Sequence, residues 1–265
     1  MEGNMAAVLK NAARERLDAG ELALGVILRQ ARTVDIAPAM KACGFDWLFL
    51  DLEHNSMDVD MAVQIAVAAL GAGIAPVARV PAGQLWMATR FLDGGGLGIV
   101  VPHVDTPEEA RKIAQALRYP PLGHRSVAGG LPHYGYDKLP LAETCNGINA
   151  ATLVIVMLET PTAIANADAI AAVPGIDSLL IGTNDLAMEH GIPGGFADER
   201  IVAAYQTVCD ACAKHGKFAG VGGIGDEALL RRYIQMGVRV VLPGSDLNFL
   251  MSAASTSAAT MRACL

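Results

Sequence analysis

The amino-acid sequence predicts a (β/α)8 barrel, an α/β fold in which eight parallel strands alternate with helices. Eight apolar runs rich in Val, Ile and Leu recur along the chain, and segments with helix signals lie between most of them. The runs are continuous rather than alternating, which is typical of strands buried on both faces. A doubly wound open sheet is the alternative. Its dinucleotide-binding version is disfavoured because no G-x-G-x-x-G motif follows the first run.

The expected strands are spaced so that most connections have room for a helix. They cover residues 23–29, 47–52, 75–80, 98–104, 151–159, 178–183, 218–223 and 238–244. No linker-like segment separates them, so a single domain over residues 1–265 is expected.

Three of the connections carry clear helix signals. Residues 106–119 open with Thr106 as a cap, Pro107 at the first helical position and two acids in the first turn. Residues 160–175 open with the same Thr-Pro pair, and residues 226–237 begin with Asp and end with Gly. The run from residue 246 to residue 265 predicts a terminal helix.

One segment departs from this alternation. Residues 119–150 form a long interruption, rich in Pro and Gly, after the fourth strand and its helix. A segment of this length in a compact domain is usually functional, so we expect either a lid or an interface loop.

Composition and charge exclude several classes of protein. The net charge is −7 and no long basic run occurs, which argues against a nucleic-acid partner. No apolar stretch reaches the length of a membrane span, and the N-terminal stretch lacks the apolar core of a signal peptide. With 52% hydrophobic and 18% charged residues, the composition is that of a globular protein, and we expect it to be cytoplasmic and not to bind membranes.

The five cysteines do not indicate a disulfide framework, because their number is odd and their spacing is scattered. Cys209 and Cys212 form a C-x-x-C motif inside an expected helix. The favoured interpretation is two small buried side chains one turn apart. A redox or zinc role is the alternative, although no second Cys or His pair lies at ligand spacing.

In a barrel, catalytic side chains come from the carboxyl ends of the strands. Polar residues stand at this position after six of the eight expected strands. They are Asp51, Glu53 and His54 after the second, Arg79 after the third, His103 after the fourth, Glu159 after the fifth, Asp185 after the sixth, and Ser245 and Asp246 after the eighth. Such an acid can also cap the next helix, and for Asp51 and Asp246 this structural role is as well supported as a functional one.

Glu159 and Asp185 are the strongest candidates for metal ligands. Glu159 ends a fully apolar strand, and the next residue, Thr160, is already a good helix cap. An unpaired buried carboxylate is costly, so a cation is its simplest partner. Asp185 follows the neighbouring strand, and two carboxylates with open positions suit Mg²⁺ or Mn²⁺. Zinc is less suited, because no His or Cys lies at ligand spacing beside either acid.

The remaining candidates add a cation and a base. Arg79 offers a permanently charged fork for a carboxylate or a developing oxyanion, with a structural ion pair as the alternative. His54 is a candidate general base, but the residues alone do not rank it securely above His103. A metal held by two carboxylates beside an Arg and a His suggests enolate chemistry on a 2-keto acid.

Five stretches resemble the HpcH/HpaI family of metal-dependent (class II) pyruvate aldolases, and they extend from about residue 20 to residue 250 in the family's order. They are GFDWLFLDLEHNSMD, APVARVP, LDGGGLGIVVPHVDTPEEARKIAQALRYPP, VIVMLETPTAIANADAIAAVPGIDSLLIGTNDLAMEHG and VVLPGSDLNFL. The resemblance implies a (β/α)8 barrel of the phosphoenolpyruvate/pyruvate superfamily. It also implies a C-terminal helix that is often swapped between subunits, and a homo-oligomer, commonly a hexamer built as a trimer of dimers.

The activity that the resemblance implies is reversible cleavage of a 4-hydroxy-2-keto acid to pyruvate and an aldehyde, with Mg²⁺, Mn²⁺ or Co²⁺. Its metal ligands fall on Glu159 and Asp185, its base on His54 and its transition-state arginine on Arg79. The acid that supports the histidine falls on Asp93 in FLDGG.

The resemblance also indicates how pyruvate is held. Backbone groups of the turn at Gly182, Thr183 and Asn184 would receive its carboxylate. Two departures bear on specificity. Met157 stands where well-known members carry a substrate-contacting Gln, and the turn reads GTNDLA where GPxDLS is common.

The roles of Asp51, Glu53 and His103 stay open at this stage. These three residues and Met157 are expected to contact the groups that hold the metal and the base, rather than the substrate itself. For Asp51 and Glu53, contacts between subunits are the alternative.

Three other functions remain as alternatives. An acyl-CoA lyase of the malyl- or citryl-CoA type would need a basic groove, for which only Arg125, Lys138 and a few scattered charges are available. A 2-keto acid decarboxylase would share the enolate. A non-catalytic metabolite-binding barrel is the third alternative.

Overall fold

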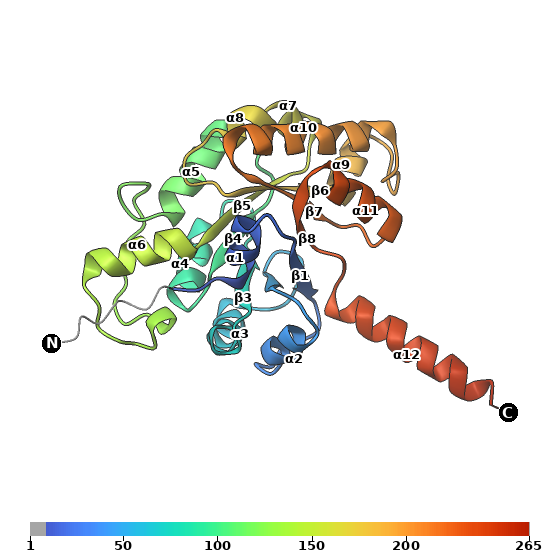
Figure 1. Cartoon of the computed structure of the whole chain (residues 1–265), viewed down its shortest axis with the longest axis horizontal. Coiled ribbons are helices and arrows are strands. Elements are labelled where there is room, and N and C mark those ends of the chain that lie inside the picture. The colour runs from blue at the N-terminus through green and yellow to red at the C-terminus, as the bar shows by residue number, and fades with distance from the viewer. Residues whose placement is uncertain (1–8, 265) are drawn as a thin grey trace.

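The computed structural model of the protein describes residues 9–264. Eight parallel strands close into a barrel in chain order, with helices around its outside (Figure 1). The strands are β1 (Ala23–Leu28), β2 (Trp47–Asp51), β3 (Ala75–Arg79), β4 (Gly98–Val101), β5 (Leu153–Leu158), β6 (Ser178–Gly182), β7 (Phe218–Gly222) and β8 (Val238–Val241). The expected (β/α)8 barrel is confirmed, and each strand lies within one of the expected runs.

Helices occupy the connections between the strands, including the three that carry predicted capping signals. They are α1 (Ala12–Asp18), α2 (Ile36–Ala42), α3 (Val59–Ala72), α4 (Leu85–Asp93), α5 (Pro107–Leu117), α6 (Leu141–Ala151), α7 (Pro161–Ala165), α8 (Ala167–Ala171), α9 (Thr183–Glu189), α10 (Glu199–His215), α11 (Glu227–Met236) and α12 (Asp246–Arg262). Thr106 and Glu109 form a capping box at α5, and Thr160 caps α7. The helix expected over residues 160–175 is divided at Asn166 into α7 and α8.

The interior of the barrel is packed around two aromatic side chains of β2. Trp47 and Phe49 point inward with apolar residues of the other strands, and both are almost fully buried. The indole of Trp47 passes directly over Gly25 on β1, where a Cβ atom would lie 2.3 Å from Cε2 of Trp47. Gly25 is therefore required by the close approach of Trp47, whose Nε1 donates to the Ala23 carbonyl at 3.2 Å.

The long segment between α5 and β5 lies at the N-terminal end of the barrel. It contains a short 3₁₀ helix (Pro132–Tyr134) and helix α6, so it is more ordered than the expected loop over residues 119–150. His133 forms a hydrogen bond of 2.9 Å with the carbonyl of Gly96, which lies just before β4 begins. Because catalytic barrels bind substrate at the opposite, C-terminal end of the strands, this segment does not cover the mouth of its own barrel as a lid.

The C-terminal helix α12 extends away from the barrel (Figure 1). None of its residues is buried. Ser245 caps it by accepting a hydrogen bond from the amide of Asn248. The alternative that Asp246 is the cap is wrong, because its carboxylate binds the chain just after β1 instead. Over residues 9–264, none of the helices is both long and apolar enough to span a membrane.

Candidate active site

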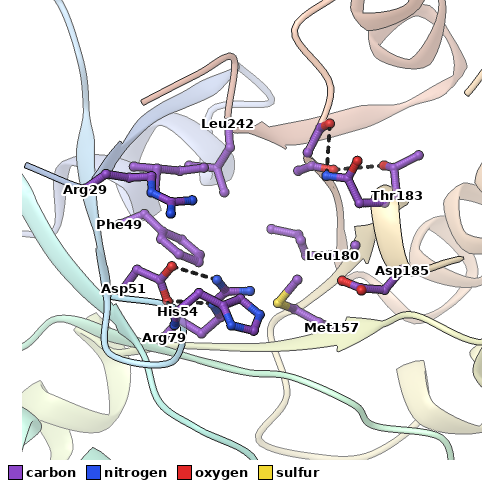
Figure 2. Close-up of a pocket in the computed structure, with 15 residues that line it drawn as sticks. Arg29, Phe49, Asp51, His54, Arg79, Met157, Leu180, Thr183, Asp185 and Leu242 are labelled. Carbon is purple, nitrogen blue, oxygen red and sulfur yellow. Dashed lines mark hydrogen bonds and ion pairs between the residues drawn. The ribbon is translucent and has the colours of Figure 1, made fainter. Parts of the chain in front are cut away.

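A cavity of about 180 Å³ opens at the C-terminal ends of the strands (Figure 2). It is smaller than the pockets of roughly 300–1,000 Å³ that hold drug-sized ligands, so it suits a small metabolite. The residues that line it are Ile27, Arg29, Phe49, Asp51, His54, Arg79, Met157, Leu180, Gly182, Thr183, Asn184, Asp185, Gly222, Gly223 and Leu242. Four of the nine polar residues predicted from the strand ends, Asp51, His54, Arg79 and Asp185, therefore meet at one cavity.

Arg79 is held by a two-point ion pair with Asp51. The two residues are register partners at the ends of β3 and β2. Nε of Arg79 lies 2.9 Å from Oδ1 of Asp51, and Nη2 lies 2.7 Å from Oδ2. Burial alone would raise the pKa of Asp51, but the hydrogen bonds and charge of Arg79 lower it overall. Burial alone would lower the pKa of Arg79, and the Asp51 carboxylate raises it overall, so both groups are charged at neutral pH.

Asp51 also organises the loop that carries His54. Its Oδ1 accepts hydrogen bonds from the amides of Glu53 and His54 at 3.2 and 3.3 Å. These contacts support the expectation that Asp51 positions other residues of the site. Its one buried carboxylate binds both the Arg79 guanidinium and the backbone of the loop that carries His54. The imidazole of His54 itself is more than half exposed and lines the cavity, with Nε2 3.6 Å from Oε2 of Glu53.

Glu53 lies between three candidate residues. Its carboxylate is 3.3 Å from Nη1 of Arg79 and 3.9 Å from Nε2 of His103, in addition to its approach to His54. Oε2 of Glu53 is buried and has no hydrogen-bond partner of good geometry among the described residues. Glu53 thus adds negative charge next to Arg79 without being fully satisfied itself.

Glu159 is buried at the end of β5, and His103 is its main partner. The amide of His103 donates to Oε2 at 2.8 Å, and Nδ1 of the same residue lies 3.1 Å from that oxygen. His103 adopts a φ of 55°, a left-handed conformation that is uncommon for a residue with a side chain. Burial raises the pKa of Glu159, and the nearby Asp185 carboxylate raises it further against the opposing effect of His103.

Asp185 lies in the first turn of α9, directly after β6. Its side chain is exposed and lines the cavity, as Figure 2 shows. Gly182 precedes the helix and provides no side-chain cap, so the leading amides of α9 have no side-chain acceptor. Thr183 is fully buried, and its hydroxyl bonds to Tyr205 and to the Gly222 carbonyl, which leaves its backbone as the part that can meet a ligand.

The Glu159 and Asp185 carboxylates fit a divalent cation. Oε1 of Glu159 lies against Gly182, where an added Cβ would be 2.5 Å away, so only glycine leaves the carboxylate its place. A buried carboxylate whose pKa is raised by a second carboxylate is stabilised by a positive charge between them. Within residues 9–264 no third His, Cys, Asp or Glu completes a cluster, so further ligands would come from water and substrate, as is usual for Mg²⁺.

Asp93 is not brought to His54 within one chain. It ends α4, at the N-terminal end of the barrel, and its carboxylate pairs at 2.5 Å with Nη2 of Arg125. His54 lies at the opposite end, in the loop after β2. The role expected for Asp93 thus fails within a single chain, because helix α4 carries it away from the mouth.

The cavity floor is apolar at Met157, the position where the resemblance implies that a substrate-contacting Gln has been replaced. Met157 lines it with Phe49 and Leu180, and it offers no hydrogen bond to a ligand beyond its weak thioether acceptor. The sequence analysis missed Arg29, which lines the cavity from the end of β1. Its signal was present, since Arg29 is the cation that ends the first expected strand.

Comparison with known proteins agrees with this geometry. Residues 27–253 match the family model described as HpcH/HpaI aldolase/citrate lyase. The chain is 36% identical over 247 residues to a 4-hydroxy-4-methyl-2-oxoglutarate aldolase of Hapsidospora irregularis, with 91% of each chain covered. It is 34% identical to a 5-keto-4-deoxy-D-glucarate aldolase of Escherichia coli O6:H1, covering 83% of this chain and 84% of that one.

Solved structures give the same result. The crystal structure of an HpcH/HpaI aldolase from Desulfitobacterium hafniense DCB-2 superposes with a TM-score of 0.90 at 25% identity, covering 96% of this chain and 97% of that chain. An HpcH/HpaI aldolase/citrate lyase family protein from Burkholderia cenocepacia J2315 superposes with a TM-score of 0.85 at 30% identity, covering 96% of this chain and 100% of that one.

Proposed function

The chain belongs to the HpcH/HpaI aldolase/citrate lyase family and is an aldolase-type lyase. From this premise we propose which reaction it catalyses and which residues take part. The reaction is reversible cleavage of a 4-hydroxy-2-keto acid to pyruvate and an aldehyde. The observation that carries the proposal is that the buried Glu159 carboxylate lies near enough to Asp185 for the two to interact electrostatically, and that Asp185 lines a cavity together with Arg79 and His54. This set provides a cation site, a permanent positive charge and a base around one small space.

Glu159 and Asp185 would hold the divalent cation, which we propose to be Mg²⁺, Mn²⁺ or Co²⁺. When bound, the cation supplies Lewis-acid stabilisation of negative charge on the oxygen atoms of the keto acid. The carboxylate of the keto acid would lie at the first turn of α9, at Gly182, Thr183 and Asn184, where backbone amides are free of side-chain caps.

His54 moves the proton in the proposed cleavage. It removes the proton of the 4-hydroxyl as the bond between carbon 3 and carbon 4 breaks, and the electrons of the O–H bond form the aldehyde carbonyl. The electrons of the broken carbon–carbon bond pass to the keto oxygen and form the enolate. Carbon 3 then takes a proton from water to give pyruvate, and His54 releases to water the proton that it removed. Arg79, which Asp51 holds in place, would stabilise the negative charge that develops on the keto oxygen.

The burial of Arg125 disfavours the acyl-CoA lyase alternative. This arginine was one of the few cations available for the phosphates of coenzyme A, but its side chain is 1% exposed and paired with Asp93. Lys138 and a few scattered charges are left. A 2-keto acid decarboxylase and a non-catalytic metabolite-binding barrel are separated from the aldolase by the experiment below.

We also propose that the protein is a homo-oligomer, specifically a hexamer built as a trimer of dimers. Helix α12 leaves the barrel without burying a single residue, and its Leu250, Met251 and Met261 are about 60% exposed (Figure 1). An unpartnered helix of this kind supports swapping onto a second copy. If Asp93 serves His54, it does so between copies, because the two lie at opposite ends of one barrel. A cytoplasmic location remains a prediction.

Activity with and without metal tests the proposal. Metal-free enzyme, prepared with EDTA, is expected to be inactive toward pyruvate and aldehydes, and activity should return with Mg²⁺, Mn²⁺ or Co²⁺. Product analysis separates aldol adducts from simple loss of CO₂. Activity that survives EDTA, together with inactivation by borohydride only when substrate is present, would instead establish a Schiff-base enzyme. If the protein is a non-catalytic barrel, His54→Ala and Arg79→Ala should leave the measured turnover unchanged.

A further inference from the structure

Arg29 is a cation in the cavity wall that the proposed chemistry does not use. It directly follows β1, and Figure 2 shows its side chain directed toward the cavity from the side of Leu242. Arg79 is neutralised by Asp51 and Glu53, whereas the guanidinium of Arg29 forms no ion pair or side-chain hydrogen bond with residues 9–264. An unpaired guanidinium facing a cavity is suited to an anionic group of a ligand.

The backbone of Arg29 is held from both sides. Its amide donates to Oδ1 of Asp246 at 2.7 Å, and the amides of Gln30 and Ala31 donate to Oδ2 at 2.9 and 2.8 Å. Its carbonyl accepts from Nδ2 of Asn55 at 3.1 Å. The backbone of Arg29 is therefore fixed, so a ligand needs to order only its side chain.

A second cavity adjoins the first at Arg29. It has a volume of about 230 Å³ and lies between the ends of β1, β7 and β8. Both cavities share Ile27, Arg29, Asn184, Gly223 and Leu242. Among the described residues that line this second cavity, Arg29 is the only charged one. A substrate extending from the Asp185 side past Arg29 would thus enter a space with one positive charge and no acid.

We propose that Arg29 binds a carboxylate at the distal end of the substrate, and that the enzyme therefore prefers 2-keto dicarboxylic acids and anionic aldehydes. The inference rests on the proposed function for the direction in which the substrate lies. Asp246 is a positioning residue in it, because it acts on the backbone of Arg29 and not on the ligand.

Equilibrium binding tests Arg29 without turnover. 2-Oxoglutarate and 2-oxopentanoate have the same five-carbon chain and differ in a terminal carboxylate or methyl group, and neither has a 4-hydroxyl to cleave. By calorimetry in the presence of Mn²⁺, the wild type is expected to bind 2-oxoglutarate more tightly. Arg29→Gln should weaken 2-oxoglutarate roughly 10- to 100-fold, as expected for a charge-assisted pair, and change 2-oxopentanoate much less.

Two variants serve as controls. Arg29→Lys keeps the charge but loses the fork, so it should recover part of the preference. Arg231→Gln removes an exposed arginine of α11 that pairs with Glu227 and lines neither cavity, and should leave both affinities unchanged. Equal weakening of both ligands by Arg29→Gln, or no preference for 2-oxoglutarate in the wild type, would overturn the inference.

The synthetic direction gives a second measurement. Glyoxylate and glycolaldehyde are two-carbon aldehydes that differ in a carboxylate or hydroxymethyl group, and each can be condensed with pyruvate. Arg29→Gln should lower kcat/KM for glyoxylate selectively. Exchange of the pyruvate methyl protons with deuterated water, followed by NMR, reports the pyruvate half-reaction alone. Its absence in the wild type would reject the proposed function, whereas normal exchange without loss of glyoxylate preference in the variant would reject only the role of Arg29.

Discussion

Arg79 and Asp51 occupy paired positions on neighbouring strands and face each other through two hydrogen bonds of 2.9 and 2.7 Å. The same Asp51 carboxylate receives the amides of Glu53 and His54. One buried acid therefore connects the arginine of the site to the loop of its candidate base. Its loss is expected to disturb both at once.

The Asp51→Asn variant should fold less stably and lose most of its activity. Removing one partner of a buried ion pair typically costs about 3–5 kcal/mol, and we expect the lower part of this range because Glu53 remains 3.3 Å from Arg79. We expect kcat to fall by on the order of 100-fold, as when a transition-state contact is misplaced. The matched control is Asp60→Asn, an exposed acid of α3 that bonds only to Gln64. A variant with normal kcat would show that Arg79 does not need this anchor.

Acid titration separates the ion pair from simple loss of packing. The pKa of Asp51 is lowered in the folded protein, so the pair contributes stability that is fully present above the unfolded-state pKa of about 3.9 and is lost as pH falls through the lower folded pKa. The difference in unfolding free energy between wild type and Asp51→Asn should be constant from pH 5 to pH 7 and shrink below pH 4. Urea denaturation at each pH measures it, and a difference independent of pH would contradict the ion-pair account.

Much of the fold was predictable because the signals are local. Continuous apolar runs and Thr-Pro caps identified the eight strands and helices α5 and α7, and strand ends identified Asp51, His54, Arg79 and Asp185 of the cavity. The pairing of Asp51 with Arg79 was not predicted, because it depends on strand register. The sequence motif around Asp93 does not show at which end of the barrel the residue lies. That depends on the direction of helix α4, which ends at Asp93. The role of Asp246 was missed for a similar reason, since its partners at residues 29–31 lie more than two hundred positions away.

Glu159→Gln is expected to change stability and metal binding in opposite directions. The raised pKa of Glu159 means that ionising it costs folding free energy: the cost begins above the unfolded-state pKa and is complete once pH exceeds the raised folded-state pKa. A neutral Gln removes this cost, so metal-free Tm at pH 8 should rise by about 2–4 °C, which corresponds to on the order of 1 kcal/mol. The increase in Tm that Mn²⁺ gives the wild type should disappear. Differential scanning calorimetry with and without Mn²⁺ measures both changes, and a retained Mn²⁺ effect would exclude Glu159 as a ligand.

Cys209 and Cys212 should be unreactive in the native protein. Both are buried in α10, and burial raises the pKa of Cys209 to about 11 and that of Cys212 to about 12. Since the thiolate is the reactive form, iodoacetamide at pH 8 should label exposed Cys43 but neither of these two. After labelling in guanidinium, mass spectrometry should find Cys43, Cys209 and Cys212 all modified. The raised values also mean that their contribution to stability is lost as pH rises from about 8.5 toward 12. Native labelling of either residue would favour the redox interpretation of the C-x-x-C motif.

Mixing two inactive variants tests whether Asp93 acts on the His54 of a second copy. Within one chain Asp93 ends α4 and pairs with Arg125, at the end of the barrel away from His54. If assembly brings the residues together, His54→Ala and Asp93→Asn homo-oligomers should each lose activity. Hybrids refolded from both should regain part of it, because one kind of interface then combines an intact His54 with an intact Asp93. The matched control mixes His54→Ala with Arg79→Ala, whose defects fall on the same side of the interface and should not complement. Activity in Asp93→Asn alone, or no recovery in its hybrids, would leave Asp93 with only the structural role that its ion pair with Arg125 provides.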